Sequence, residues 1–396
     1  SSSCGPFCLA LAGTSDSLFA RVKISRVDLY RYELPLTAPL QLGASTVAHR
    51  RGLLLRIRTE QGAAGWGDAA PLPGFSRESL ADVIAHARAA VPPWIGTELP
   101  GPGADRTRSW QALPLGDDAP PSFRFATESA LVDLFADAHG LSVPEGLEAL
   151  HSDGENEPSS TPRSTVGLNA LITNLLEEGP EQARQCREQG YRAVKVKVGR
   201  APLDREVGAL RRVRAELGEA VALRADANRA WSVEEAAAFA EATRDLDVAY
   251  VEEPLASPSR RSELAARTDL PIALDETTRE VGPDVLRDGP PVRAVVLKPT
   301  LLGLREAQAW ARAATAQGGI PVLSASYESG VGLRMLVALA AVGPDVPVGL
   351  STYDRLAADV LRPPLPMDRP TIDVASVVAQ ETLDADRLDR IDAFSA

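Results

Sequence analysis

Histidine and cysteine are scarce in this chain of 396 residues, and each scarcity limits the available chemistry. The four histidines all lie at or before His151, so chemistry in the rest of the chain cannot depend on an imidazole base. The three cysteines, Cys4, Cys8 and Cys186, give neither a disulfide framework nor a metal-binding spacing. A reducing, cytoplasmic location fits this set best.

Long apolar runs and a positive net charge are also missing. No run approaches the roughly 20 apolar residues that a membrane-spanning helix needs. The formal net charge of -12 disfavours a nucleic acid or an anionic membrane as a partner. Residues 1–20 carry only Asp16 as a charge and lack a basic start, so we expect a disordered leader outside the fold.

Lysine is the most informative of the scarce residues. The 42 basic residues are 38 arginines and only four lysines, namely Lys23, Lys195, Lys197 and Lys298. A chain that uses arginine wherever a positive charge suffices keeps lysine where a proton must be released near neutral pH, which arginine cannot do. The composition therefore predicts that some of these lysines act in acid/base catalysis.

The first part of the chain has the pattern of an α+β domain. Residues 22–34 and 52–58 are typical of strands, and residues 76–90 and 127–138 are typical of helices. Strands followed by helices suggest that the strands form one sheet with the helices packed beside it. We expect this domain to cover residues 21–150.

Eight short β-branched runs follow the polar segment 152–164, with Ala-rich amphipathic stretches between them. The runs cover residues 164–171, 191–198, 220–227, 247–253, 270–276, 292–299, 320–326 and 346–351. Such runs at near-regular intervals predict a TIM-like (β/α)7β barrel over residues 164–359 rather than an open sheet. The expected fold class is α/β, with the N-terminal α+β domain as a cap that residues 360–396 join.

Carboxylates stand at the C-terminal ends of three consecutive runs, on the face where barrel enzymes build their active sites. They are Asp226, Glu252 and Asp275, about one βα unit apart. A salt bridge or a helix cap explains one such carboxylate, but hardly three on neighbouring strands. Because converging carboxylates repel one another unless a cation joins them, these hard oxygen ligands predict a Mg²⁺ site, for which Mn²⁺ could substitute.

Lysines flank the carboxylates on both sides. Lys195 and Lys197 belong to the second run, and Lys298 belongs to the sixth. Because side chains alternate along a strand, Lys195 and Lys197 are expected to point inward together, rather than forming a solvent-facing strand edge. A neighbouring positive charge and a nearby metal ion both lower the pKa of a lysine, which makes it a usable base.

Four motifs resemble the enolase superfamily, in the branch whose members carry lysines on two strands, as muconate-lactonizing enzymes do. The motifs are GWGDAAPLPGFSRESL (65–80), RADANRAW (224–231), VVLKPTLLG (295–303) and SASYESGVGL (324–333). Within that branch, residues 22–355 are most similar to the o-succinylbenzoate synthase family. The resemblance implies a metal-binding lyase, a dehydratase of menaquinone biosynthesis.

The resemblance also implies roles for particular residues. The three carboxylates would bind Mg²⁺, Lys197 and Lys298 would form the acid/base pair, and Lys195 would support Lys197. Asn228 and Glu276 would lie directly behind these groups and support them.

Substrate contacts follow from the same resemblance. Ser324 and the backbone of Gly349 would hold a carboxylate of a small-molecule substrate, and a second loop near 43–50 would help to close the site. A first cap loop would close over the substrate with three residues, Gly74, Phe75 and Ser76.

These roles imply a Mg²⁺-dependent syn-dehydration of 2-succinyl-6-hydroxy-2,4-cyclohexadiene-1-carboxylate to o-succinylbenzoate. The alternative is an N-acylamino acid racemase or dipeptide epimerase on the same scaffold, since both also need two opposed lysines. The KPT sequence at Lys298, where epimerases tend to carry an acidic residue soon after the lysine, favours the dehydratase, as does the PLPGFS cap loop.

Two further classes are disfavoured. A mandelate-racemase-type enzyme would need a histidine after residue 151, and a non-catalytic binding barrel would not retain lysine against the arginine bias. The sequence leaves open which lysine transfers the proton and whether the protein forms a homo-oligomer.

Overall fold

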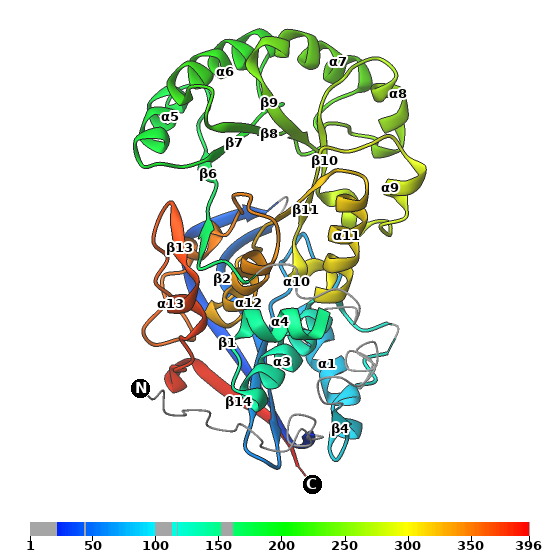
Figure 1. Ribbon diagram of the computed structural model, residues 1–396, viewed down its shortest axis with the longest axis vertical. Coiled ribbons are helices and arrows are strands. Elements are labelled where there is room, and N and C mark those ends of the chain that lie inside the picture. Colours follow the sequence, from blue (N-terminus) through cyan, green and yellow to red (C-terminus); the bar gives the residue numbers. More distant parts are fainter. Residues whose placement is uncertain (1–21, 43–44, 100–112, 117, 152–160, 396) are drawn as a thin grey trace, which may run out of the picture.

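The computed structural model describes residues 22–42, 45–99, 113–116, 118–151 and 161–395. The predicted leader over residues 1–20 lies outside the described residues. Figure 1 shows an arc of helices and strands from the middle of the chain above a second body, which holds the N-terminal sheet and its helices. Among the described residues, no helix is both long and apolar enough to cross a membrane.

An antiparallel sheet forms the core of the N-terminal part. Its strands, in the order β14-β1-β2-β3 with β4 also paired to β1, are β14 (Leu388–Ser395), β1 (Val22–Leu42), β2 (Ser45–Thr59), β3 (Ala64–Ala69) and β4 (Glu98–Leu99). Inward-facing residues of β1 and β2, among them Val27, Leu29 and Leu55, are fully buried. Both predicted strands are confirmed, although each is longer than the pattern indicated.

Three helices accompany this sheet: α1 (Leu80–Ala90), α3 (Pro121–His139) and α4 (Val143–His151). Helix α1 begins four residues later than predicted, because Ser79 and Asp82 form a capping box at its start. Helix α3 begins earlier than predicted, since Pro121 occupies the first turn, where a missing N–H is tolerated. A Cβ on Gly67 would lie 1.8 Å from the carbonyl oxygen of Ala126, so glycine lets β3 pack directly on α3.

Seven parallel strands and one short closing segment form the barrel. The strands lie in the sheet in the same order as in the sequence, so that each one pairs with the next. They are β6 (Ala170–Ile172), β7 (Ala193–Lys197), β8 (Ala222–Asp226), β9 (Val248–Glu252), β10 (Ile272–Leu274), β11 (Ala294–Leu297) and β12 (Ile320–Leu323). Val348 bridges to Leu168 beside β6, and Gly349 bridges to Ser324 beside β12, so the eighth run closes the circle. Seven of the eight predicted runs coincide with a barrel strand, the first to within one residue, and the eighth supplies the closing bridges. The (β/α)7β barrel is confirmed.

Helices follow the barrel strands, and α5 to α9 lie on the outer side of the arc in Figure 1. They are α5 (Gly179–Glu188), α6 (Leu203–Leu217), α7 (Val233–Ala242), α8 (Arg261–Ala265), α9 (Val285–Asp288), α10 (Pro299–Leu302), α11 (Leu304–Ala316) and α12 (Gly330–Val342). Short 3₁₀ turns are η2 (Pro92–Trp94), η3 (Arg244–Leu246), η4 (Pro258–Arg260), η5 (Glu276–Arg279), η6 (Ser351–Arg355) and η7 (Ala385–Arg387). Gly190 and Gly318 follow the ends of α5 and α11 with φ of +85° and +76°, the conformation that stops a helix.

The C-terminal segment contacts both parts of the molecule. Strand β13 (Thr371–Asp373), followed by α13 (Val374–Val378), pairs with β5 (Thr165–Gly167), which directly precedes the first barrel strand β6. Strand β14 then pairs with β1 at the edge of the N-terminal sheet. The domain bounds at 21–150, 164–359 and 360–396 stay a prediction.

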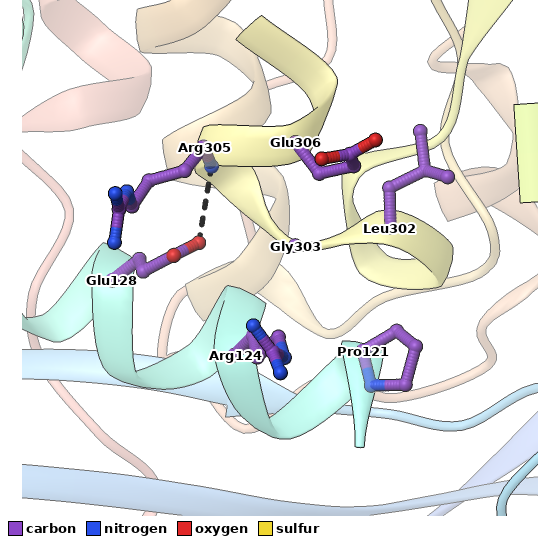
Figure 2. Close-up of a pocket in the computed structure, with 7 residues that line it drawn as sticks. All are labelled: Pro121, Arg124, Glu128, Leu302, Gly303, Arg305 and Glu306. Carbon is purple, nitrogen blue, oxygen red and sulfur yellow. Dashed lines mark hydrogen bonds between the residues drawn. The ribbon is translucent and has the colours of Figure 1, made fainter. Parts of the chain in front are cut away.

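A buried carboxylate also fastens the N-terminal part to the barrel. Glu128, on α3, accepts the backbone N–H groups of Leu304 at 2.6 Å and Arg305 at 3.1 Å, at the start of α11. Figure 2 shows this contact at the edge of a small pocket between the two helices. The free N–H groups of a helix start are thereby satisfied by a side chain from the other part of the molecule.

Candidate active site

Strand β7 turns both of its lysines toward the mouth of the barrel. Val194 and Val196 are fully buried, whereas the side chains of Lys195 and Lys197 are 18% and 25% exposed. This alternation agrees with the sequence expectation, because one face of a barrel strand packs on helices and the other faces the interior. Lys298 follows β11 and stands at the start of α10, with 18% of its side chain exposed.

The three carboxylates lie on neighbouring strands at nearly the same height. Asp226 is paired in register with Lys197 on one side and with Glu252 on the other. Asp275 directly follows β10, the next strand. All three are buried, so their oxygens share a space that little solvent reaches.

Each of the three barrel lysines, Lys195, Lys197 and Lys298, is bonded to at least one of these carboxylates. Lys195 Nζ lies 2.7 Å from Asp226 Oδ2 and also bonds Glu252. Lys197 Nζ donates to Asp226 Oδ2 at 2.5 Å, and Lys298 Nζ donates to Asp275 Oδ1 at 2.5 Å. The structure thus brings together all six residues that the sequence singled out.

The charges in this cluster shift the pKa values of its members. Burial acts to lower the pKa of Lys195, but the negative charges of Glu252, Asp226 and Asp275 outweigh it and raise that pKa. Burial acts to raise the pKa of Asp226, but Lys195 and Lys197 hold it below its usual range. For Lys195 the direction is thus opposite to the lowering expected from its lysine neighbour, because carboxylates surround it more closely.

Glu252 shows that the carboxylates are crowded. Burial, the largest cause, and the charges of Asp226 and Asp275 together raise its pKa to about 7, against the opposing effect of Lys195. A divalent cation relieves such crowding, since it is attracted to all three oxygen groups at once.

The donor set fits magnesium in its chemistry. Among the described residues, no three histidine, cysteine, aspartate or glutamate side chains are gathered as they would be around a metal ion, because the carboxylates are turned to the lysines. Asp226, Glu252 and Asp275 are nevertheless hard oxygen ligands on adjacent strand ends, and Mg²⁺ prefers such ligands. That these three residues hold the ion stays a prediction.

Asn228 and Glu276 adjoin the cluster, and their supporting role stays a prediction. The backbone N–H of Asn228 donates to Asp226 Oδ1 at 3.1 Å, and its Oδ1 accepts from Lys197 Nζ at 2.7 Å. Its Nδ2 donates to Glu276 Oε1 at 3.2 Å. Asn228 holds this position with a φ of +45°, which asparagine tolerates better than most residues.

Ser324 and Gly349 lie side by side at the closing seam of the barrel. A Cβ on Gly349 would lie 3.1 Å from Ser324 Oγ and 3.5 Å from Asn169 Oδ1, so the glycine keeps this corner open. The sequence analysis missed Asn169, which is buried and accepts a hydrogen bond from Arg224. Its position at the end of the first predicted strand was the available signal.

The predicted cap loop forms a compact turn. The backbone N–H groups of Phe75 and Ser76 donate to the carbonyl oxygen of Leu72, and Ser76 Oγ accepts from the Leu72 N–H. Gly74 has a φ of +80°, which glycine alone adopts readily. The loop bonds to the barrel through Arg279 on η5. Contact of Gly74, Phe75 and Ser76 with substrate stays a prediction, and residues 43–44 of the second loop lie outside the described residues.

Sequence reasoning also missed a buried aspartate that joins two of the four motifs. Asp68, in the first motif, accepts hydrogen bonds from the Tyr32 hydroxyl at 2.8 Å and from the N–H and hydroxyl of Ser329 at 2.9 and 2.8 Å. Burial raises its pKa to about 6. A charged residue inside an otherwise apolar segment was the signal that could have found it.

Comparison with known proteins first defines the class. A family model described as enolase C-terminal domain-like matches residues 179–377, half of the chain, and a model of the MenC N-terminal domain matches residues 24–103. The barrel with its carboxylates and lysines is thus that of the enolase superfamily. An o-succinylbenzoate synthase from Yersinia pseudotuberculosis (serotype O:1b, strain IP 31758) is 33% identical over 348 residues, 86% of this chain and 95% of that protein. The chain belongs to the o-succinylbenzoate synthase family.

A second relative is much longer than this chain. Protein PHYLLO, chloroplastic, from Arabidopsis thaliana is 32% identical over 347 residues, which are 79% of this chain and only 20% of that protein. The chain therefore spans about a fifth of its length and nearly the whole length of the Yersinia enzyme.

Solved structures agree with the fold. The L-Ala-D/L-Glu epimerase from Bacillus subtilis matches with a TM-score of 0.72 and 24% identity, over 89% of this chain and 96% of that one. An enolase-superfamily member from Roseovarius nubinhibens, complexed with magnesium, matches with a TM-score of 0.76 and 19% identity, over 95% of this chain and all of that one. At such identities the likeness concerns the fold alone.

Proposed function

We propose that this chain is a lyase that dehydrates 2-succinyl-6-hydroxy-2,4-cyclohexadiene-1-carboxylate to o-succinylbenzoate, a step of menaquinone biosynthesis. The observation that supports this most is the cluster itself. Lys197 and Lys298 stand at opposite ends of a row of three carboxylates, in a chain related to o-succinylbenzoate synthases along nearly their whole length. Such a row suits removal of a proton next to a substrate carboxylate.

The lysines carry the proton chemistry in this proposal. In a syn-elimination, the proton and the hydroxyl leave from one face of the ring, so one group can take the first and then protonate the second. Lys197 would take the proton α to the ring carboxylate and return it to the departing hydroxyl, which leaves as water while the ring becomes aromatic. Lys298, on the opposite side, would keep its proton and stabilise negative charge that develops on the substrate.

The carboxylates would hold the cofactor. Mg²⁺, when bound by Asp226, Glu252 and Asp275, would supply positive charge to the substrate carboxylate and so make the adjacent C–H bond more acidic. Mn²⁺, also a hard cation, would substitute. Lys195 would hold Asp226 and Glu252 in place through its two contacts.

The same proposal includes the remaining substrate contacts and the location of the protein in the cell. Ser324 and the Gly349 backbone would bind a second carboxylate of the substrate, and the cap loop would close over it. A cytoplasmic location suits this pathway, and the oligomeric state stays open.

An N-acylamino acid racemase or dipeptide epimerase is the alternative, because two opposed lysines also suit proton exchange at an α-carbon. Thr300, after Lys298, is buried and donates to Glu328 at 2.6 Å, so the position offers no acidic group to a substrate amine. This observation favours the dehydratase.

The decisive experiment is incubation of the purified protein with the cyclohexadiene substrate and Mg²⁺, with absorbance used to follow the aromatic product. We expect turnover by the wild-type protein and a rate at least about 100-fold lower in Lys197→Arg. Absence of dehydration together with rapid racemisation of N-acylamino acids would establish the alternative instead.

A further inference from the structure

Two arginines join the cap loop at residues 72–77 to the η5 turn of the barrel, and Arg279 makes the larger set of contacts. Arg279 Nη1 donates to the carbonyl oxygen of Phe75 at 2.7 Å, and its guanidinium lies over the Phe75 ring, 5.5 Å from the ring centre. In the opposite direction, Arg77 donates to the carbonyl oxygen of Arg279. A groove of about 300 Å³ runs between the two segments.

On the barrel side, Arg279 ends the η5 turn, which begins directly after Asp275. Buried Glu253 fixes the start of this turn, because it accepts the backbone N–H groups of Asp275 at 2.9 Å and Thr277 at 2.8 Å. Arg229 bonds Glu253 at 3.2 Å and reaches Glu280, the residue after Arg279, at 2.6 Å. The groups that place Asp275 therefore also place Arg279.

On the cap side, the loop is a single hydrogen-bonded turn. Its turn is closed by hydrogen bonds between Leu72 and the pair Phe75 and Ser76. A contact made at Phe75 consequently positions the whole turn, including the residues that we expect to face substrate.

We propose that Arg279 is a positioning residue that holds the cap loop on the η5 turn, so that closure of the loop is tied to the placement of Asp275. Among the described residues, the hydrogen bonds and ring contact of Arg279 are made with Arg77 and Phe75 rather than with the lysines. Its planar guanidinium both stacks on the Phe75 ring and donates to the Phe75 carbonyl, a combination that lysine reproduces poorly. The kinetic part of the test rests on the proposed function, whereas the proteolytic part does not.

The first measurement is trypsin cleavage after Arg77, in the full-length protein with Mg²⁺ and without substrate. Arg279→Met removes the anchor and should speed the appearance of the fragment that begins at Glu78 by about tenfold, because cleavage follows the population of the open loop. Arg279→Lys should lie between this variant and wild type. Arg212→Met, an exposed arginine on α6, is the matched control and should cleave as wild type does.

Equal cleavage after Arg77 in wild type and in both Arg279 variants would overturn the inference. If Arg279→Met melts at a lower temperature than wild type, the cleavage rate after Arg77 is compared between wild type and Arg279→Lys, which keeps the charge. Faster cleavage in Arg279→Lys supports the inference, and an equal rate overturns it. A failure of the wild-type protein to dehydrate the cyclohexadiene would remove the proposed function and leave this readout intact.

The second measurement is steady-state dehydration kinetics. A loosened cap loop should raise KM for the cyclohexadiene about tenfold in Arg279→Met and lower kcat less, since loop contacts contribute to substrate binding. A merely structural role would lower the active fraction, which reduces kcat at unchanged KM. That second pattern would also overturn the inference.

Discussion

At the scale of single residues, the scarcity of lysine makes the exchange of lysine for arginine a sharp test. Arginine keeps the positive charge, but its pKa is too high for proton transfer. We expect Lys197→Arg to lower kcat by about 100- to 10,000-fold while the protein stays folded. Lys298→Arg should be harmful but less so, if its role is electrostatic. The measurement is dehydration kinetics, with circular dichroism as the check on folding.

Lys23 is the internal control for this series. Its side chain forms an exposed ion pair with Glu60, far along the chain from the barrel cluster, so Lys23→Arg should leave kcat unchanged. Equal tolerance of arginine at positions 23, 197 and 298 would contradict the acid/base assignment. It would also revive the interpretation of the barrel as a non-catalytic scaffold.

The carboxylates allow a second test at this scale. Asp226→Asn, Glu252→Gln and Asp275→Asn each remove one charged oxygen ligand, so each should abolish most activity and weaken Mg²⁺ binding by at least about tenfold. Isothermal titration with Mg²⁺ measures the second effect without turnover. Chelation should inactivate the wild-type enzyme without unfolding it. Near-normal activity in any of the three variants would show that the ligand set is wrong.

At the scale of elements, the contact between Glu128 on α3 and the start of α11 makes the stability of the protein depend on pH. Burial raises the pKa of Glu128 from 4.5 to about 7, against the opposing effect of the backbone N–H groups that it accepts. Because the folded state holds this proton more tightly than the unfolded state does, the contribution of Glu128 to stability falls as the pH rises from 4.5 to 7.

Glu128→Gln removes this dependence, because glutamine stays neutral and keeps an oxygen that accepts the N–H groups. We expect the free energy of unfolding of Glu128→Gln to exceed that of wild type by about 2 kcal/mol at pH 8, with a smaller difference at pH 5. Urea denaturation at both pH values measures it. Glu306→Gln, an exposed neighbour in the same pocket (Figure 2), is the control, and a difference independent of pH would contradict the prediction.

At the scale of the whole molecule, Asp68 joins the N-terminal sheet to the last barrel helix. Asp68→Ala would leave the buried Tyr32 hydroxyl and the Ser329 N–H without their acceptor. We expect a loss of about 2–4 kcal/mol in the free energy of unfolding, measured by denaturant titration. Asp269→Ala, at an exposed position in the barrel, should change stability by less than about 0.5 kcal/mol. Similar losses in both variants would exclude a special role for Asp68.

Much of the barrel and its cluster could be read from local pattern. Side chains alternate along every strand, and parallel barrel strands end on one face, so Lys197, Asp226 and Glu252 had to meet once the strands were located. The start of α3 lies six residues before the predicted start at residue 127, because Pro121 fits the first turn of a helix.

What the sequence by itself determined is therefore the eight strands, their order and the residues at their C-terminal ends, because strand period and spacing are local properties. Only the tertiary structure decided that Arg279 meets Phe75, that Asp68 meets Ser329, and that Lys195 lies among carboxylates that raise its pKa. Those contacts join segments far apart in the chain. Their geometry depends on how the two parts of the molecule pack, and no local periodicity encodes that packing.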